Sequence, residues 1–341
     1  MLALLFLACA PDPTPEDVSP VLPDAQATPV QPQESEFDFW WGRWSVENLG
    51  PSGALWVNIG DAEAHIQPIL SGRATLEQWV GTVNGNSLNG FSVRSFNADA
   101  QRWDLKLNWP NGSPAPFSSM VGTFEDGLGQ FFAENVSGQS YSRFTFSEAQ
   151  ADSCQWDSSY TTDGGGHWTT TWIMEFSRLD DPEAADGATF PIADPPESSR
   201  CTDESARQLD GLVGAWSGTV RSLRADGVWA EGTTEVAVSS MIDGCGLLHF
   251  ADDTWADDLL SQSFGAIAHA GAWYRIGATS LDPTLRTARG LLDGDTLTLT
   301  EDDALRERWS GVGTDTLTWT LETSADGETW EEIVVRELQP R

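Results

Sequence analysis

The chain has 341 residues, with 18 Lys and Arg against 52 Asp and Glu, so its formal net charge is −34. This length predicts about two domains, because single hydrophobic cores stop growing near about 250–300 residues. The charge argues against a nucleic-acid partner, since such a surface would repel phosphates. The apolar share of 40% and the 17 Trp exclude a wholly disordered acidic chain.

The chain opens on a short apolar segment, residues 1–8, that is followed by Cys9. Eight residues of helix span about 12 Å against a hydrocarbon core of about 30 Å, so this segment is too short to cross a membrane. The run Phe6-Leu7-Ala8-Cys9 resembles the lipobox of bacterial lipoproteins, in which the signal is cleaved before a Cys that then carries lipid. It departs from that pattern at Phe6, where Leu is usual, and by having no Lys or Arg before it. The alternative is an apolar start without a targeting role.

A disordered acidic tether is predicted for residues 9–35. Residues 10–35 hold seven Pro, five carboxylates and no Lys or Arg, a composition that stays extended and solvated. Such a tether would lift a domain off the membrane, to which acyl chains on Cys9 would bind. The resemblance therefore implies a membrane-anchored lipoprotein of the bacterial cell envelope that faces the periplasm or the cell exterior.

Two copies of one unit follow, at residues 36–180 and 206–341, joined by an acidic, Pro-containing linker at 181–205. The first copy opens with Phe37-Asp38-Phe39-Trp40-Trp41-Gly42-Arg43-Trp44. The second opens with Leu209-Asp210-Gly211-Leu212-Val213-Gly214-Ala215-Trp216, which has Asp, Gly and Trp at the same spacing. Near their ends, Trp156, Asp163-Gly164 and Trp168 of the first copy correspond in order to Trp319, Asp326-Gly327 and Trp330 of the second.

About ten short antiparallel strands are predicted in each copy, from alternating apolar residues and from Asn-Gly and Asp-Gly turns between them. In the second copy they are predicted to begin near Trp216, Glu235, Gly246, Gln262, Trp273, Thr287, Thr296, Arg306, Leu317 and Trp330. A meander of this length needs closure to hide its edge strands, so two tandem up-and-down barrels are favoured over sandwiches. Residues 37–41 and 204–213 are predicted to be short helical turns that plug one end of each barrel.

Three motifs resemble a large, functionally uncharacterised group of bacterial secreted proteins with lipocalin-like barrels. They are the opening Phe37-Asp38-Phe39-Trp40, the strand Ala74-Thr75-Leu76-Glu77-Gln78-Trp79 and the closing Asp163-Gly164-Gly165-Gly166-His167-Trp168. The second copy resembles the same group from Cys201 onward. The resemblance implies an all-β chain of two tandem lipocalin-like barrels, and it implies no particular activity. The closing hairpins also resemble the Asp-box of sialidases, which is a folding element.

One disulfide is expected among the four Cys. If Cys9 is lipidated, three thiols remain, so at most one intramolecular bridge can form. The group that the chain resembles commonly has a Cys at the positions of Cys201 and Cys245, which implies a bridge between these two; the first copy has Arg73 in place of the second Cys. Cys154 is then a buried free thiol. The alternative is three reduced, buried thiols.

No signature of catalysis or metal binding is present. The chain has no HExxH, CxxC or GxSxG motif and no Walker loop. Its acid clusters, at 252–253, 257–258 and 301–303, lack the spacing of calcium loops, and we interpret them as solvated loops. The sequence therefore predicts no metal, no cofactor and no assigned catalytic residue.

The excess of Trp is the remaining signal. Aromatic side chains line pockets for small ligands, but small barrels also use Trp to fill their cores. The candidates for lining a pocket are Trp79, Trp103, Trp109, Trp255, Trp273, His249 and His269. The leading hypothesis is an anchored lipoprotein whose barrels bind a small hydrophobic ligand or act as a surface scaffold. The alternatives are a surface protein with filled barrels whose loops contact glycans or partners, and an unrecognised enzyme. A hollow barrel would favour the first, and a Trp-packed interior the second.

Overall fold

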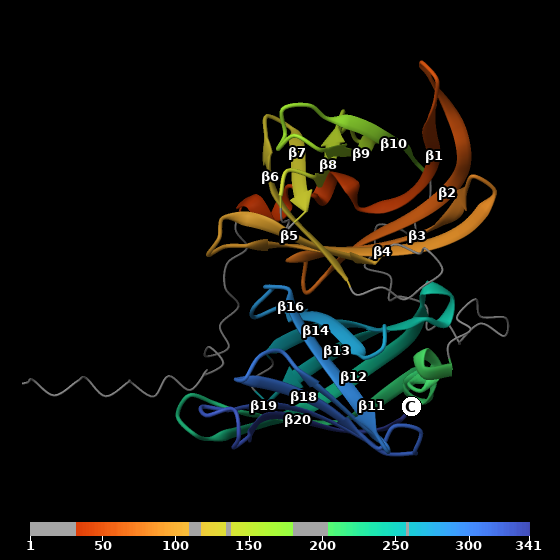
Figure 1. The fold of residues 1–341 in the computed structure, drawn as a ribbon. Coiled ribbons are helices and arrows are strands. Elements are labelled where there is room, and N and C mark those ends of the chain that lie inside the picture. The colour runs from red at the N-terminus through yellow and green to blue at the C-terminus, as the bar shows by residue number, and fades with distance from the viewer. Residues whose placement is uncertain (1–31, 109–116, 134–137, 180–203, 257–258) are drawn as a thin grey trace, which may run out of the picture.

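The computed structural model consists of two closed antiparallel barrels of ten strands each (Figure 1). It describes residues 32–108, 117–133, 138–179, 204–256 and 259–341. In each barrel, every strand pairs with its neighbours in sequence and the last strand pairs with the first. The prediction of two tandem lipocalin-like barrels is therefore confirmed.

The strands of the first barrel are β1 (Gly42–Ser52), β2 (Leu55–Ile69), β3 (Ala74–Val83), β4 (Asn86–Asn97), β5 (Arg102–Asn108), β6 (Ser118–Glu125), β7 (Leu128–Ala133), β8 (Tyr141–Ser147), β9 (Ser153–Thr161) and β10 (Thr169–Arg178). Those of the second are β11 (Gly214–Leu223), β12 (Trp229–Met241), β13 (Gly246–Trp255), β14 (Leu260–His269), β15 (Trp273–Thr279), β16 (Arg286–Asp293), β17 (Thr296–Thr300), β18 (Leu305–Ser310), β19 (Leu317–Thr323) and β20 (Glu331–Pro340). Nine of the second barrel's strands begin within two residues of the predicted positions. The exception is β12, which begins at Trp229 because the β11–β12 hairpin stays paired up to Leu223 and Trp229.

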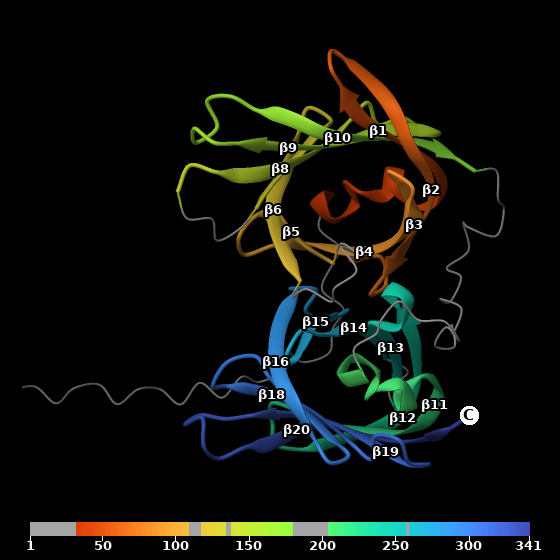
Figure 2. The ribbon, with the colours of Figure 1, turned by 45° about the vertical axis from the view of Figure 1, so that its right-hand side comes forward.

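A short helical segment lies inside each barrel, as the sequence predicted (Figure 2). The first plug, residues 32–41, contains η1 (Pro32–Ser35) and η2 (Asp38–Trp40); the second plug, residues 204–213, contains η4 (Glu204–Arg207) and η5 (Asp210–Leu212). Trp44 Nε1 donates to the Trp40 carbonyl at 2.7 Å, and Trp216 Nε1 donates to the Leu212 carbonyl at 2.9 Å. The repeated indole thus ties each plug to the first strand of its barrel.

The predicted tether ends earlier than residue 35. Its last four residues form η1, where the buried Glu34 accepts hydrogen bonds at 3.1 and 3.2 Å from Arg73, in the turn just before β3. This ion pair makes Pro32–Ser35 part of the first barrel. Residues 204–205 were included both in the predicted linker and in the predicted helical turn, and they lie in η4. Cys9, the rest of the tether and residues 181–203 lie outside the described residues.

Aromatic side chains fill the first barrel. Phe37 of the plug is fully buried, and its ring centroid lies 4.8 Å from that of Trp103, 4.9 Å from Phe124 and 5.4 Å from Phe146. In the second barrel, buried aliphatic residues share this role with Trp216, Trp309 and Trp319. No helix in the described ranges is long and apolar enough to cross a bilayer.

A third hydrophobic core joins the two barrels, which lie against each other in both views (Figures 1 and 2). It combines the outer faces of β3 and β4 with those of β13, β14 and β15. Its buried members include Leu76, Phe91, Leu248, Phe264 and Ile276. Polar contacts flank it: the Ser71 amide donates to Gln262 Oε1 at 2.6 Å, and Arg73 Nη1 donates to the Ser280 carbonyl at 2.7 Å. The described parts of the barrels therefore form one packed unit.

Candidate functional site: a buried Arg–Glu–Ser cluster in the first barrel

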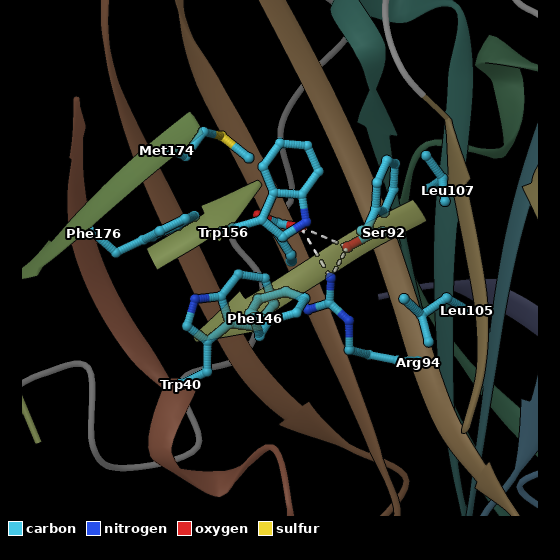
Figure 3. Close-up of a pocket in the computed structure, with 11 residues that line it drawn as sticks. Trp40, Ser92, Arg94, Leu105, Leu107, Phe146, Trp156, Met174 and Phe176 are labelled. Atoms are coloured by element: carbon cyan, nitrogen blue, oxygen red, sulfur yellow. Dashed lines mark hydrogen bonds and ion pairs between the residues drawn. The ribbon is translucent and has the colours of Figure 1, made fainter. Parts of the chain in front are cut away.

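A small cavity remains inside the first barrel (Figure 3). Its volume is about 20 Å³, which is close to what one water molecule needs. It is lined by Trp40, Glu77, Ser92, Arg94, Leu105, Leu107, Phe144, Phe146, Trp156, Met174 and Phe176. Glu77, Ser92 and Arg94 are the polar and charged members of a lining that is otherwise apolar and aromatic.

The strand ladder brings these three polar side chains together. Glu77 of β3 lies opposite Ser92 of β4, and Arg94 is two residues further along β4, so all three point to the barrel interior. Ser92 Oγ donates to Glu77 Oε2 at 2.5 Å, and Arg94 Nη2 donates to Ser92 Oγ at 2.9 Å. The same Nη2 lies 3.4 Å from Glu77 Oε2 and completes a buried ion pair.

Arg94 has unused hydrogen-bonding capacity. Arg94 is 3% exposed. Its guanidinium carbon lies 4.1 Å from the ring centroid of Trp40 and 5.4 Å from that of Phe146. Nε and Nη1 are buried and have no hydrogen-bond partner in the part of the chain that the structure describes. Because buried donors are nearly always satisfied, two open donors at a cavity mark a place for a water molecule or for a ligand atom that accepts hydrogen bonds.

The electrostatics of the cluster favour a neutral acceptor. Burial raises the pKa of Glu77, against the opposing effects of Arg94 and Ser92. Burial also lowers the pKa of Arg94, to about 10, so the guanidinium stays charged at neutral pH. Because the Glu77 carboxylate already balances this charge, a carbonyl, ether or hydroxyl oxygen suits the open donors better than a second anion. Burial raises the pKa of nearby Cys154 to about 12, so this free, buried Cys stays a thiol.

The Trp residues predicted to line a pocket lie elsewhere. Trp79 and Trp103 are buried in the first barrel's core but do not border the cavity, and Trp103 Nε1 instead donates to Glu36 at 2.8 Å. Trp109 lies outside the described residues. In the second barrel, Trp255 donates to Ser261 Oγ at 3.2 Å, and the Trp273 ring lies 5.0 Å from that of His269.

Arg94, Glu77, Trp40 and Trp156 line the cavity, but the sequence did not predict them as pocket residues. Glu77 follows Leu76 and Arg94 follows Val93, but Gln78 and Ser95 come next, so neither charged residue lies within an apolar run that would mark it as buried. The excess of Trp was the stronger signal, and it pointed to other side chains.

His249 of the second barrel occupies the position that corresponds to Glu77. It lies opposite Gly265 as Glu77 lies opposite Ser92, and it is buried, with its ring 5.0 Å from that of Trp309. A Cβ atom at Gly265 would lie 1.9 Å from His249 Nε2, so only Gly leaves room for the imidazole. Nε2 has no hydrogen-bond partner among the described residues.

Two buried ion pairs also lie in the second barrel. Arg275 Nε lies 2.7 Å from Glu307 Oε2, and Arg336 pairs with Asp253. Burial, and after it Arg275 and Arg336, lowers the pKa of His249 well below its ordinary value of 6.5. The imidazole is therefore neutral at physiological pH.

We expect His249 to make stability fall as the pH falls below about 6.5. The folded protein keeps His249 neutral, whereas the unfolded chain takes up a proton there, so acid favours unfolding. One such group contributes a loss of about 1 kcal/mol between pH 6.5 and 5.5. Urea denaturation at pH 7.5, 6.5 and 5.5 should show a shallower loss for His249→Leu than for wild type. Equal slopes for wild type and His249→Leu would contradict the assignment.

The cysteines and the closing hairpins have structural roles. Cys245 is disulfide-bonded. Cys201, its predicted partner, lies outside the described residues, so this pairing stays a prediction. In the first closing hairpin, Thr161 Oγ1 and the His167 amide both donate to Asp163 Oδ1, at 2.8 and 2.9 Å. These bonds hold the turn itself. Across the described residues, no group of three or more His, Cys, Asp or Glu is placed to hold a metal ion.

Comparison with known proteins assigns the chain to no family. No known family profile matches the chain, and no curated protein sequence matches it. Rv2717c from M. tuberculosis is 16% identical, covers 41% of this chain with 98% of its own length, and superposes with a TM-score of 0.32. The S-type phycobiliprotein lyase CPES from Guillardia theta is 15% identical; the match covers 44% of this chain and 99% of the lyase, with a TM-score of 0.30. A DUF3598-family protein of unknown function from Nostoc punctiforme is 13% identical; the match covers 92% of this chain and 100% of that protein, with a TM-score of 0.28. Values this low transfer no function to this chain.

Proposed function

We propose that this protein is a lipid-anchored component of the bacterial cell envelope whose first barrel binds a small, largely apolar molecule. The observation that carries the proposal is Arg94, a buried cation whose Nε and Nη1 donors are open at an internal cavity. Aromatic and aliphatic side chains would hold the body of the ligand, and an acceptor oxygen would receive the bonds of Arg94. The ligand class is therefore a neutral hydrophobic molecule with a carbonyl, ether or hydroxyl group.

Ligand entry requires a change at the first plug. The present cavity of about 20 Å³ accommodates little more than a water molecule, and Trp40 of the plug covers one face of the Arg94 guanidinium. A larger ligand would displace Trp40 and take over its stacking position. The plug is held to the barrel wall by the Trp44 bond and the Glu34–Arg73 pair. Further bonds run from Trp103 Nε1 to Glu36, from Trp41 Nε1 to Thr75 Oγ1, and from Arg178 to the Phe39 and Trp41 carbonyls. Release of the whole plug would therefore break several polar contacts.

The tightly filled interiors support a second candidate. If the barrels never open, the protein acts as a surface scaffold that contacts glycans or partner proteins through its loops. In that case Arg94 and Glu77 serve only to organise the core, and a water molecule satisfies the open donors.

Removal of the cluster's charges separates these candidates. We expect protein purified from its own host to retain a small molecule in native mass spectrometry. The double variant Glu77→Gln/Arg94→Met, which removes both charges of the cluster together, should lose most of it. A hydrogen bond to a charged group contributes about 1.5–3 kcal/mol, which corresponds to a loss of affinity on the order of 10- to 100-fold. Arg102→Met, on the partly exposed end of β5, is the matched control. Absence of any bound molecule in wild type, or equal retention by the double variant, would reject binding at Arg94.

The anchor has its own test. With a basic segment placed ahead of residue 1 and expression in a bacterial host, we expect the protein to fractionate with membranes, and the Cys9→Ser variant to be released. The physical reason is that acyl chains supply the membrane affinity, since the acidic protein contributes no basic patch. Membrane and soluble fractions are compared by immunoblot, and the same distribution for both proteins would contradict lipidation at Cys9.

A further inference from the structure

The β1–β2 hairpin extends beyond the wall of the first barrel. β1 pairs with β10 only from Trp44 to Leu49, and β2 pairs with β3 only from Ala62 to Ile69. Residues 50–57 pair only with each other, in the register Gly50 to Val57, Pro51 to Trp56 and Ser52 to Leu55. We call residues 50–57 the tip ribbon. Figure 1 shows it projecting away from the barrel and from the inter-barrel contact.

The chemistry of the tip ribbon differs from that of the rest of the surface. Leu55 is 69% exposed, and Trp56 and Val57 are each 40% exposed. No Asp, Glu, Lys or Arg occurs between Asn48 and Gly60, although the chain contains 52 acidic residues. The corresponding turn of the second barrel carries Arg224 and Asp226. An uncharged, apolar projection on so acidic a protein indicates a surface that contacts an apolar environment.

We propose that the tip ribbon inserts into the surface of a lipid bilayer. Three adjacent apolar side chains on a two-stranded ribbon are far too small for a stable protein interface, which buries about 1,200–2,000 Å². Shallow insertion into lipid needs only a few apolar groups, and Trp is the side chain that favours the headgroup boundary. The inference rests on the membrane-anchored part of the proposed function, because an anchor would hold the ribbon within reach of the bilayer.

Charge predicts which lipids the tip ribbon prefers. Since the ribbon carries no cation and the protein has a net charge of −34, anionic lipid surfaces repel it. Insertion is therefore driven by apolar burial and should be stronger on zwitterionic vesicles. The difference between the two lipid types should shrink as salt screens the repulsion.

A local probe tests the proposal. In full-length protein carrying Cys9→Ser, Leu55→Cys is labelled with an environment-sensitive fluorophore and mixed with phosphatidylcholine vesicles. We expect its emission to shift to the blue and to be quenched by brominated lipid. A label at Leu291→Cys, which is 66% exposed on β16 of the second barrel, should do neither. Replacement of Leu55 and Trp56 by Asn should weaken vesicle binding on the order of tenfold.

Three results would overturn the proposal. They are a Leu55 label that does not respond to vesicles, equal responses at Leu55 and Leu291, and dimerisation in ultracentrifugation that the two Asn substitutions abolish. The last result would make a second copy of the chain the occupant. The outcome is separable from the anchor, because Cys9→Ser is scored by fractionation of cells and the ribbon by its own label.

Discussion

Asp253→Ala is expected to destabilise the second barrel by about 3–5 kcal/mol, a large share of the 5–15 kcal/mol that holds a typical domain folded. Arg336 binds Asp253 through two hydrogen bonds of 3.0 and 2.7 Å, and the side chains are 6% and 4% exposed. Without the carboxylate, the buried guanidinium keeps, among the described residues, Ser263 Oγ at 3.2 Å and the ring of Trp319. The cost is that of an unpaired buried charge, and chemical denaturation followed by circular dichroism measures it.

Two further variants establish that burial causes the effect. The Arg341–Glu235 pair has a similar distance, 2.9 Å, but its side chains are 60% and 62% exposed. Glu235→Ala should therefore cost less than about 1 kcal/mol. The double variant Asp253→Leu/Arg336→Met removes both charges and should recover most of the loss, because apolar residues can replace a buried ion pair at little cost. If Asp253→Ala were as mild as Glu235→Ala, Arg336 would have to reach solvent.

The barrel fold was predictable because its signals are local and repeat. The starts of the strands follow from the turn dipeptides and from the alternation of apolar and polar residues, and the same pattern occurs in both copies. The plug was predictable for the same reason, since the Asp within it and the Gly and Trp just after it recur at one spacing in both copies. Closure followed from the number of strands, as a ten-stranded meander leaves edges that a barrel removes.

The candidate site was not predictable because β4 reverses the usual meaning of strand alternation. A single-core barrel places apolar residues inside and polar residues outside. On β4, Phe91 and Val93 face the second barrel, while Ser92 and Arg94 face the first barrel's interior. Period-two alternation identifies two faces but does not say which one is internal. Only the docking of the second barrel, a long-range contact, makes the outer face apolar.

The same docking gives Arg73 a role that its copy-two counterpart does not have. Cys245 is disulfide-bonded at that position, whereas Arg73 links Glu34 of the first plug to the Ser280 carbonyl of the other barrel. One side chain therefore connects the plug, the barrel wall and the inter-barrel contact. The wall strands β3 and β4 also carry Glu77 and Arg94, so the candidate site and the inter-barrel core lie on opposite faces of the same two strands.

Phe264→Glu is expected to separate the two barrels while leaving each one folded. Phe264 is fully buried in the inter-barrel core on the outer face of β14, so a carboxylate there would lack any partner in an apolar contact, and separation would hydrate it. We expect a larger radius of gyration by small-angle scattering, an unchanged far-ultraviolet β signal, and two unfolding transitions in place of one. Val93→Glu places the charge on the opposing β4 and should produce the same separation, whereas Leu291→Glu, on the exposed face of β16, should behave as wild type. A variant that keeps the wild-type radius and its single transition, or that loses the β signal of its own barrel, would show that the contact does not hold two independently stable barrels together.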